Sequence, residues 1–285
     1  MTSGLQGIGE RLHSTDSYLE IDGARLRYRD EGRGPAVVFI HGWSLDLDMW
    51  EFQAEGLASR YRIVRLDRRG FGNSTGSPSL ARDALDVGAL CEHLGLGRIA
   101  LVGMSQGARV ALQIANAAAV PLSCLVFDGA SDPDSTGTAP YTREIPHEHY
   151  RRIAQRDGMA AFRREWAMHP LTRLETDDPR AQEIRAGMLE RYPGRDLLGA
   201  EVGPQAYLPF AATLLNLRLP VLLLNGEHDL EGRRRFAAQE ASQLPLAEHV
   251  EIAEAGHLSN LDNPRAYNQV LMRFLEKHHN EHSQR

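Results

Sequence analysis

One serine in this sequence lies between two glycines at a spacing that can expose a nucleophile. The stretch Leu101–Val110 reads LVGMSQGARV, so Gly103 and Gly107 flank Ser105 in a G-x-S-x-G pattern. The apolar run before the pattern predicts a strand, and the residues after it predict a helix. At such a turn the central side chain stands above a helix N-terminus, whose free N–H groups favour developing negative charge. We therefore predict that Ser105 is a nucleophile.

A nucleophilic serine needs a base, and the base needs an acid that orients it. Two later apolar runs end in loops that carry such residues, Asp229 in GEHD and His257 in AGH. The chain order Ser, Asp, His is the one expected when the serine occupies a strand-to-helix turn. We predict that His257 accepts the proton of Ser105 and that Asp229 holds the imidazole. Asp128, at the end of the run LVFD, is the alternative acid.

The loop after the first long apolar run is a candidate for stabilising an oxyanion. It reads HGWS over residues 41–44. In this arrangement a backbone N–H from the loop acts together with the N–H of the residue after the nucleophile. We predict that these two donors are the amides of Trp43 and Gln106. His41 is expected to organise the loop by hydrogen bonds rather than to react.

Short apolar runs position all of these residues. The predicted strands are residues 36–40, 62–66, 98–102, 123–127, 220–224 and 249–252. Their apolarity is continuous rather than alternating, which indicates strands covered on both faces in a parallel sheet. Helical spacing of apolar residues supplies the covering layers, in 81–94, 108–118 and 264–277. An antiparallel hairpin is expected at the sheet edge, from 18–22 and 25–29.

The predicted fold class is therefore α/β, with a mostly parallel central sheet and helices on both faces. Every candidate residue follows a predicted strand. Loops at the carboxyl ends of parallel strands converge on one edge of the sheet, where ligands bind in open α/β folds. This common position supports a single site more strongly than any one motif does.

The alternation of strand and helix stops between residues 132 and 217. Three amphipathic helices are expected there, over 146–156, 158–168 and 179–192. We predict a core formed by 1–131 and 218–285, with 132–217 inserted as a helical cap over the carboxyl ends of the strands. Apolar side chains of the cap and the adjoining core are candidates for a pocket wall: Trp43, Leu45, Met159, Phe162, Trp166, Met168, Met188 and Tyr192. They favour a moderately hydrophobic small molecule.

Composition and motif spacing argue against several other classes of function. The net charge of −6 disfavours a nucleic-acid surface. Gly70 and Gly72 follow a strand, but no third glycine at the required spacing opens a helix, so no nucleotide site is predicted. No histidine, cysteine or acidic residues have zinc-site spacing. Cys91 and Cys124 lie in apolar contexts and are expected to be buried thiols. We expect neither a metal nor a cofactor.

The same considerations bear on location and partners. No apolar stretch approaches the roughly 20 residues that a membrane span needs. Residues 1–16 are polar and lack the apolar segment of a signal peptide. We expect a cytoplasmic protein with a small-molecule substrate, no nucleic-acid or membrane partner, and a monomeric or homodimeric state.

Taken together, the motifs resemble those of the α/β-hydrolase family. The matching stretches are HGWS at 41–44, DRRGFGNS at 67–74, GMSQG at 103–107, GEHD at 226–229 and AGH at 255–257. Within the family, AGHLSNLDNP at 255–264 and the length of the cap resemble 3-oxoadipate enol-lactonases and small carboxylesterases. The resemblance implies Ser105 as nucleophile, Asp229 as acid, His257 as base, and Trp43 and Gln106 as oxyanion donors. The chain departs from many relatives in having Ala108 after Gly107, and Gln106 where methionine is frequent.

The predicted activity is hydrolysis of a carboxylic ester or lactone through an acyl-Ser105 intermediate, which needs no cofactor. Two alternatives remain open. The same triad also serves C–C bond hydrolases and cofactor-free oxygenases or haloperoxidases in this family. A catalytically inactive ligand-binding protein could also retain these residues.

Overall fold

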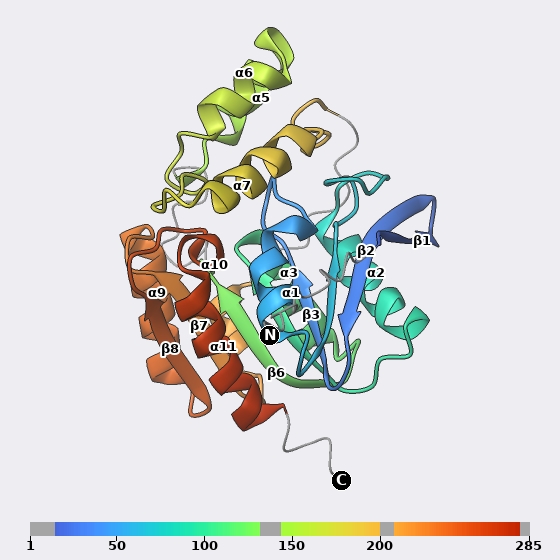
Figure 1. The fold of residues 1–285 in the computed structure, drawn as a ribbon, viewed down its shortest axis with the longest axis vertical. Coiled ribbons are helices and arrows are strands. Elements are labelled where there is room, and N and C mark those ends of the chain that lie inside the picture. Colours follow the sequence, from blue (N-terminus) through green and yellow to red (C-terminus); the bar gives the residue numbers. More distant parts are fainter. Residues whose placement is uncertain (1–14, 132–143, 200–207, 280–285) are drawn as a thin grey trace, which may run out of the picture.

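The computed structural model describes residues 15–131, 144–199 and 208–279. Within them, eight strands form one sheet in the order β1-β2-β4-β3-β5-β6-β7-β8 (Figure 1). The strands are β1 (Ser17–Ile21), β2 (Ala24–Gly32), β3 (Ala36–Ile40), β4 (Arg62–Leu66), β5 (Ile99–Met104), β6 (Leu122–Asp128), β7 (Val221–Gly226) and β8 (Ala247–Ile252). Strands β3 to β8 are parallel, and β1 and β2 pair antiparallel at one edge. The predicted strands, the edge hairpin and the α/β class are confirmed.

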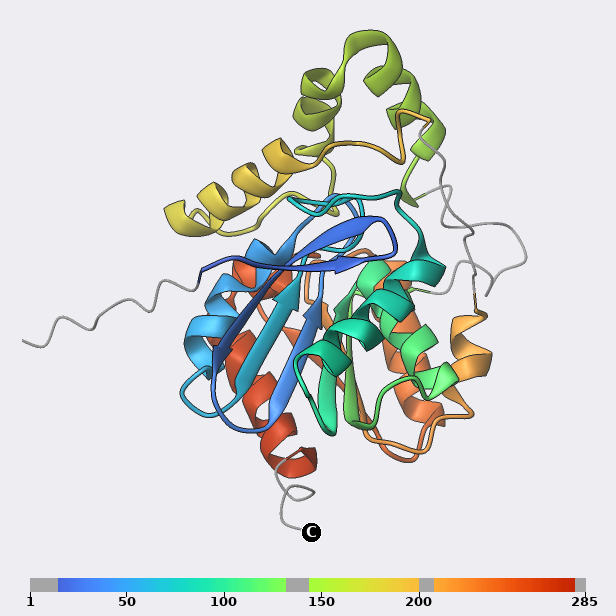
Figure 2. The same ribbon diagram turned by 90° about the vertical axis from the view of Figure 1, so that its right-hand side faces the viewer.

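Two layers of helices cover the sheet, as Figure 2 shows. One face packs against α2 (Leu80–His93), α3 (Gln106–Ala117), α8 (Phe210–Leu214) and α9 (Glu231–Gln243). The other packs against the 3-10 turn η1 (Leu47–Trp50), α1 (Glu51–Leu57), α10 (Ser259–Asp262) and α11 (Pro264–His278). The central strands β3, β5, β6 and β7 are buried almost throughout, because apolar side chains on both of their faces meet a helix layer.

Local sequence signals set where several helices begin. Ser79 precedes α2 and accepts a hydrogen bond from the N–H of Arg82. Asn263 caps α11 in the same way and is followed by Pro264, whose missing N–H costs nothing in a first turn. These caps fix where the chain leaves each strand-end loop, and so help to hold those loops in place.

Three helices form a layer above the end of the sheet to which the parallel strands point (Figures 1 and 2). They are α5 (His147–Asp157), α6 (Met159–Trp166) and α7 (Pro179–Arg191). The sequence prediction assigned residues 132–217 to a cap; within that interval α8 instead packs on the core. Its Phe210 contacts Phe127 and Phe236 edge-on, with ring centroids 5.1 and 5.6 Å apart.

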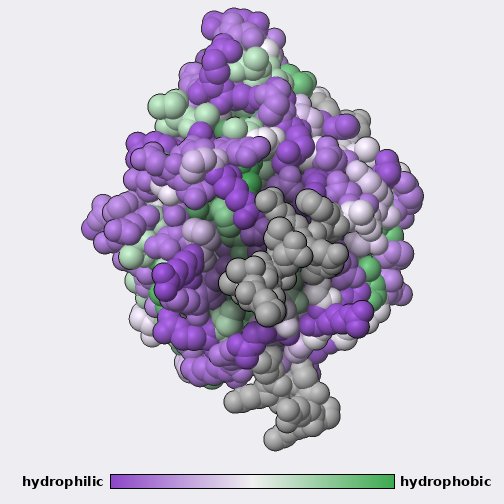
Figure 3. Space-filling view, in the orientation of Figure 1, coloured by the Kyte–Doolittle hydropathy of each residue, from purple (hydrophilic) through white to green (hydrophobic). Residues whose placement is uncertain are grey.

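None of the helices in the described residues is both long and apolar enough to cross a bilayer. Figure 3 shows mostly hydrophilic residues on one face. Large exposed apolar side chains lie at separate positions in the sequence: Leu85, Met168, Leu198, Leu215 and Leu246.

An ion-pair cluster joins the cap to the core. Arg191 of α7 donates from Nε to Asp46 at 2.8 Å and from Nη2 to Asp48 at 2.7 Å. The Asp46 side chain is only 1% exposed, whereas Arg191 is 31% exposed. Burial raises the pKa of Asp46, and the hydrogen bond and charge of Arg191 oppose that rise. Asp46 therefore depends on a partner supplied by the cap.

Replacing Arg191 with alanine is expected to lower the free energy of unfolding by about 1–3 kcal/mol. Breaking a fully buried pair costs about 3–5 kcal/mol, and solvent around Arg191 reduces that figure. Urea denaturation measures the change. Arg156→Ala is the matched control, because its pair with Asp157 lies on the solvent-exposed side of the cap. Equal stability of the two variants would contradict a structural role for the cluster.

Asp67 belongs to the same cluster, because Arg27 pairs with both Asp48 and Asp67. Its burial predicts a pH dependence of stability. Burial, then the charge of Asp46, raises its pKa from 3.8 to about 7, although Arg27 opposes the rise. The folded protein therefore holds this proton more tightly than the unfolded chain does. The resulting stabilisation is full below about pH 4 and is lost as the pH rises through about 7.

Asp67→Asn is expected to flatten the fall in unfolding free energy between pH 4.5 and 7.5. Urea denaturation of both proteins at several pH values measures the two slopes. The difference between them reports the titration of Asp67 together with its effect on Asp46, because Asp83, whose pKa burial raises to about 6, is present in both. Identical slopes would show that Asp67 does not titrate in this range.

Candidate active site

Ser105 occupies the turn between β5 and α3 in a strained backbone conformation. Its φ and ψ angles are 52° and −111°, a region that side-chain-bearing residues rarely adopt. A side chain at Gly103 would collide with the backbone of Gly107, and one at Gly107 would collide with the carbonyl oxygens of Ile40 and His41. Both glycines of the G-x-S-x-G pattern are therefore required by close approach at this turn.

His257 and Asp229 meet at the carboxyl ends of neighbouring strands. His257 Nδ1 lies 3.0 Å from each carboxylate oxygen of Asp229, and both residues are buried. Asp229 also accepts hydrogen bonds from the amide of Asn225 and the N–H of Leu230. Burial raises the pKa of Asp229, but His257 above all, with Arg233 and Asn225, brings it down to about 2. An ionised carboxylate can only accept, so Nδ1 carries the proton and Nε2 remains able to take one.

Asp128, the alternative acid, has different partners. Its carboxylate oxygens lie 3.3 and 3.4 Å from Ser259 Oγ, and it also interacts with Tyr267. Burial, then the charge of Asp229, raises the pKa of Asp128 well above its usual range. Its backbone carbonyl accepts the N–H of Ser105 at 2.7 Å. Asp128 thus supports the serine turn through its backbone, while Asp229 is the carboxylate at His257.

The loop after β3 and the start of α3 are tied together by a buried arginine. Arg68 donates to the Gly42 carbonyl at 3.2 Å and to Gln106 Oε1 at 2.7 Å, and it pairs with Asp83 at 2.9 Å. Both segments that carry the predicted oxyanion donors are therefore held by one side chain. The side-chain amide of Gln106, as distinct from its backbone N–H, accepts from this arginine. Sequence reasoning missed Arg68, although it lies in the DRRG turn.

His41 has the organising position that the sequence predicts. Its Nε2 accepts the N–H of Arg68 at 2.8 Å, so Nδ1 carries the proton and donates to the Gly42 carbonyl at 2.7 Å. Burial, then the charge of Arg68, lowers the pKa of His41 well below its usual range. A neutral imidazole with both nitrogens engaged is a structural element of the loop.

A small cavity joins Ser105, His257 and the cap. Its volume of about 10 Å³ is about the least that holds one water molecule. It is lined by Trp43, Leu45, Met104, Ser105, Ile145, Trp166, Leu171 and His257. Trp43, Leu45 and Trp166 were predicted for this wall. Ile145 and Leu171 were not, because neither stands out in the sequence from ordinary packing residues.

The remaining predicted wall residues divide between packing and solvent. Phe162 and Tyr192 belong to an aromatic cluster around Trp43, with centroids 6.0 and 5.8 Å from its ring. Met188, a residue of α7, packs into the hydrophobic core, and Met159 packs at the edge of the aromatic cluster. Met168 is exposed to solvent. The cap therefore contacts the site mainly through tryptophan and aliphatic side chains.

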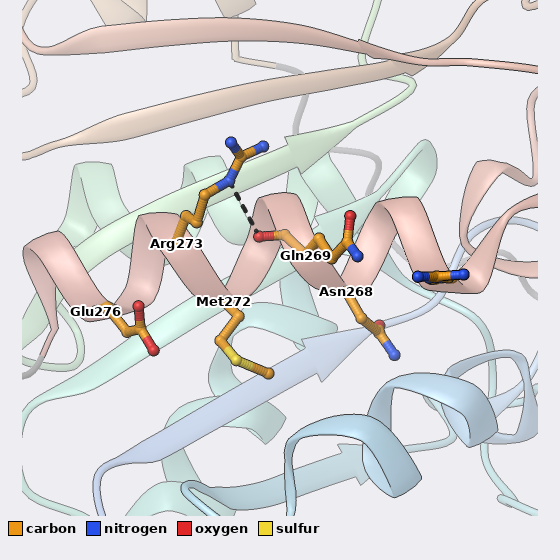
Figure 4. A pocket seen from close by; sticks show the side chains of 6 residues that line it. Asn268, Gln269, Met272, Arg273 and Glu276 are labelled. Atoms are coloured by element: carbon orange, nitrogen blue, oxygen red, sulfur yellow. Dashed lines mark hydrogen bonds between the residues drawn. The ribbon is translucent and has the colours of Figure 1, made fainter.

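A larger hollow of about 520 Å³ lies elsewhere, along α11 (Figure 4). Its walls are Arg265, Asn268, Gln269, Met272, Arg273 and Glu276. None of the predicted site residues lines it, and it carries no nucleophile beside a base. In the described part of the chain, no three histidine, cysteine or acidic side chains are grouped so that they could hold a metal ion.

Comparison with known proteins places this chain in a family. The sequence profile of the alpha/beta hydrolase fold matches residues 35–264. The chain therefore belongs to the alpha/beta hydrolase fold family of enzymes. It is 28% identical over 271 residues to a Bacillus subtilis protein that carries the name 2-succinyl-6-hydroxy-2,4-cyclohexadiene-1-carboxylate synthase, covering 89% of this chain and 96% of that one.

Solved structures include enzymes of the kinds that the sequence suggested. A thermophilic esterase from Thermogutta terrifontis superposes with a TM-score of 0.78 at 27% identity, covering 93% of this chain and 99% of the esterase. The enol-lactonase of Burkholderia xenovorans gives a TM-score of 0.73 at 21% identity, covering 91% and 100%. The similarity to the enol-lactonase shows a common fold.

Proposed function

We propose that this enzyme is a serine hydrolase that cleaves a carboxylic ester or lactone of a small, moderately hydrophobic substrate. The observation that carries the proposal is the joint position of Ser105 and His257 on one cavity, with His257 Nδ1 3.0 Å from both oxygens of Asp229. The similarity to an esterase at 27% identity over nearly the whole chain supports the same reaction class.

In the first half of the reaction, His257 Nε2 takes the proton of Ser105 as Oγ bonds to the substrate carbonyl carbon. The oxyanion accepts hydrogen bonds from the backbone N–H groups of Trp43 and Gln106. The carbonyl carbon then releases its alkoxy oxygen, which takes the proton from His257. In a lactone the released oxygen stays attached to the acyl group, and in either case the acyl group remains on Ser105.

In the second half, a water molecule gives a proton to His257 and its oxygen attacks the acyl carbon. The bond from that carbon to Oγ breaks, Ser105 recovers its proton, and the carboxylic acid leaves. Asp229 stays ionised throughout and stabilises the imidazolium that forms twice per turnover. Its pKa of about 2 suits this role, because the carboxylate remains charged at any pH where the histidine acts.

The experiment is pre-steady-state hydrolysis of p-nitrophenyl acetate together with labelling by a fluorophosphonate. We expect a nitrophenol burst that approaches one equivalent per active site when acyl-enzyme accumulates, and stoichiometric labelling of Ser105. A folded protein that neither turns over esters nor reacts with the probe would indicate a ligand-binding protein instead.

A second candidate is chemistry other than ester hydrolysis on the same three residues. The Bacillus subtilis relative is named as a synthase and aligns with 89% of this chain. C–C bond hydrolysis and cofactor-free oxygenase or haloperoxidase chemistry belong to the same class of alternatives. Labelling of Ser105 without turnover across a panel of esters and lactones would favour this second candidate.

A further inference from the structure

A buried arginine lies against the nucleophile and has no part in the proposed triad. Arg233 is in the first turn of α9, four residues after Asp229, and is 1% exposed. Its Nη1 donates to the Gly129 carbonyl and lies 3.5 Å from Ser105 Oγ. A buried guanidinium is costly unless its hydrogen bonds and charge are satisfied. The proposed triad does not explain why this cation lies beside Ser105.

The counter-charge comes from the segment that leads into the cap. Glu144 lies just before Ile145, which lines the cavity, and its Oε2 accepts from Arg233 Nε at 3.1 Å and from Nη2 at 2.8 Å. The Glu144 side chain is 21% exposed, so the carboxylate stands between the buried cation and solvent. Arg233 thus donates two N–H groups to a single carboxylate oxygen of Glu144. The same edge of a guanidinium can also bind both oxygens of a carboxylate in a bidentate pair.

His169 is a further polar side chain near Arg233. Its ring stacks on Trp166, which lines the cavity, with 4.6 Å between centroids. Burial lowers the pKa of His169, and the charges of His257, Arg233 and Glu144 also act on it. Ser105 therefore lies close both to the charged side chain of Arg233 and to the apolar side chains Trp43 and Leu45 that line the cavity. A substrate with one apolar and one anionic part matches both kinds of group.

We propose that Arg233 binds a free carboxylate of the substrate, and that Glu144 occupies this position when the site is empty. The inference rests on the proposed function and names its substrate class: an ester or lactone of a dicarboxylic acid, with one carboxyl free. The carboxylate binds the Nε–Nη2 edge of a guanidinium whose Nη1 lies at Ser105 Oγ. The scissile carbonyl and the free carboxylate are therefore separated by a short spacer of about two to four carbon atoms.

Matched esters test the proposal. Mono-p-nitrophenyl glutarate carries the free carboxylate, and p-nitrophenyl pentanoate has the same acyl length without it. We expect the enzyme to favour the glutarate ester in kcat/KM by about 10- to 100-fold, the value of hydrogen bonds to a charged group. Arg233→Gln should remove this preference, so that the two esters have equal kcat/KM. Glu144→Gln should lower KM for the glutarate ester, because it removes the competing carboxylate.

Two further variants control for folding and for charge. Arg233→Gln combined with Glu144→Gln removes both members of the pair, so no buried charge is left unpaired. Arg235→Gln changes the same helix by the same charge at a side chain that is 78% exposed. The double variant should lack the glutarate preference, and Arg235→Gln should keep it. A preference that survives the loss of Arg233, or equal kcat/KM for the two esters in the unmodified enzyme, would overturn the proposal.

A binding measurement that needs no catalysis distinguishes the carboxylate site from the proposed hydrolase activity. In isothermal titration calorimetry, the unmodified enzyme should bind glutarate at least about tenfold more tightly than it binds glutaramide. Glutarate should also bind the unmodified enzyme at least about tenfold more tightly than it binds the Arg233→Gln variant. That result would support the carboxylate site. If, in addition, no ester were hydrolysed and Ser105 did not react with the fluorophosphonate, only the proposed hydrolase activity would be refuted. Ester hydrolysis with no Arg233-dependent glutarate binding would refute the carboxylate site and leave the hydrolase standing.

Discussion

Ser105→Ala is expected to reduce kcat for p-nitrophenyl acetate by about 10⁵- to 10⁶-fold, as the loss of a triad nucleophile does in serine proteases. The reason is that no other hydroxyl can replace Oγ at this turn. Ser105 has a φ of 52° between two glycines that permit no side chain, so its position is fixed by the backbone. The measurement is steady-state hydrolysis with enzyme concentration set by absorbance and folding checked by circular dichroism.

Ser242→Ala is the matched control for this variant. Ser242 lies on α9 and donates to the Gln239 carbonyl near the protein surface. Its loss should leave kcat unchanged. Retention of more than about one tenth of the activity by Ser105→Ala would place the chemistry on another group and refute the acyl-serine mechanism.

Asp229→Asn is expected to lower kcat by about 10⁴-fold, the figure known for the orienting acid of serine proteases. An asparagine cannot stabilise the imidazolium, and it allows His257 to reverse its tautomer. Asp128→Asn should change kcat by less than about tenfold. The carboxyl group of Asp128 contacts Ser259 and Tyr267, burial and then the charge of Asp229 raise its pKa well above its usual range, and an amide has nearly the same shape.

The two aspartate variants act as controls for one another. Both lie at the ends of neighbouring strands, both are buried, and each substitution removes one carboxyl oxygen. Their steady-state kinetics are compared on one ester at one pH. A larger loss from Asp128→Asn than from Asp229→Asn would reassign the acid to Asp128.

The sequence predicts most of the fold because its signals are local. Continuous apolar runs mark β3 to β7, and each of them carries its glycine or polar turn within a few residues. Ser105 and Asp229 follow such runs and His257 follows β8, so their approximate meeting point is implied by the parallel sheet. The choice between Asp229 and Asp128 as the partner of His257 needed the contacts, because both follow strands of the same kind.

The charged partners around the site could not be predicted in this way. Arg233 lies in a run of three arginines, and no pattern shows which of them points inward. The structure turns Arg234 toward Glu251 and leaves Arg235 exposed, while Arg233 reaches Ser105. Its partner Glu144 is 89 positions away in the chain. Such pairings depend on how the cap is seated on the core, which periodicity does not encode.

The volume of the cavity could not be predicted either, because it also depends on how the cap is seated on the core. Trp43 and Trp166 are bulky residues that sequence reasoning assigns equally well to packing or to substrate contact. The structure uses them for both, since they stack edge-on at 4.8 Å and also line the space above Ser105. Because the space above Ser105 is about 10 Å³, an ester larger than a water molecule fits only if the surrounding side chains shift.

The most direct test of the central claim is the identity of the covalent intermediate. The enzyme is mixed with p-nitrophenyl acetate, quenched in acid within the burst phase, digested and analysed by tandem mass spectrometry. The mechanism predicts an acetyl group on Ser105, in substoichiometric to stoichiometric amount, and its absence from Ser105→Ala. Ester turnover with the acetyl group on another residue, or with no acetylated residue in the burst phase, would contradict it.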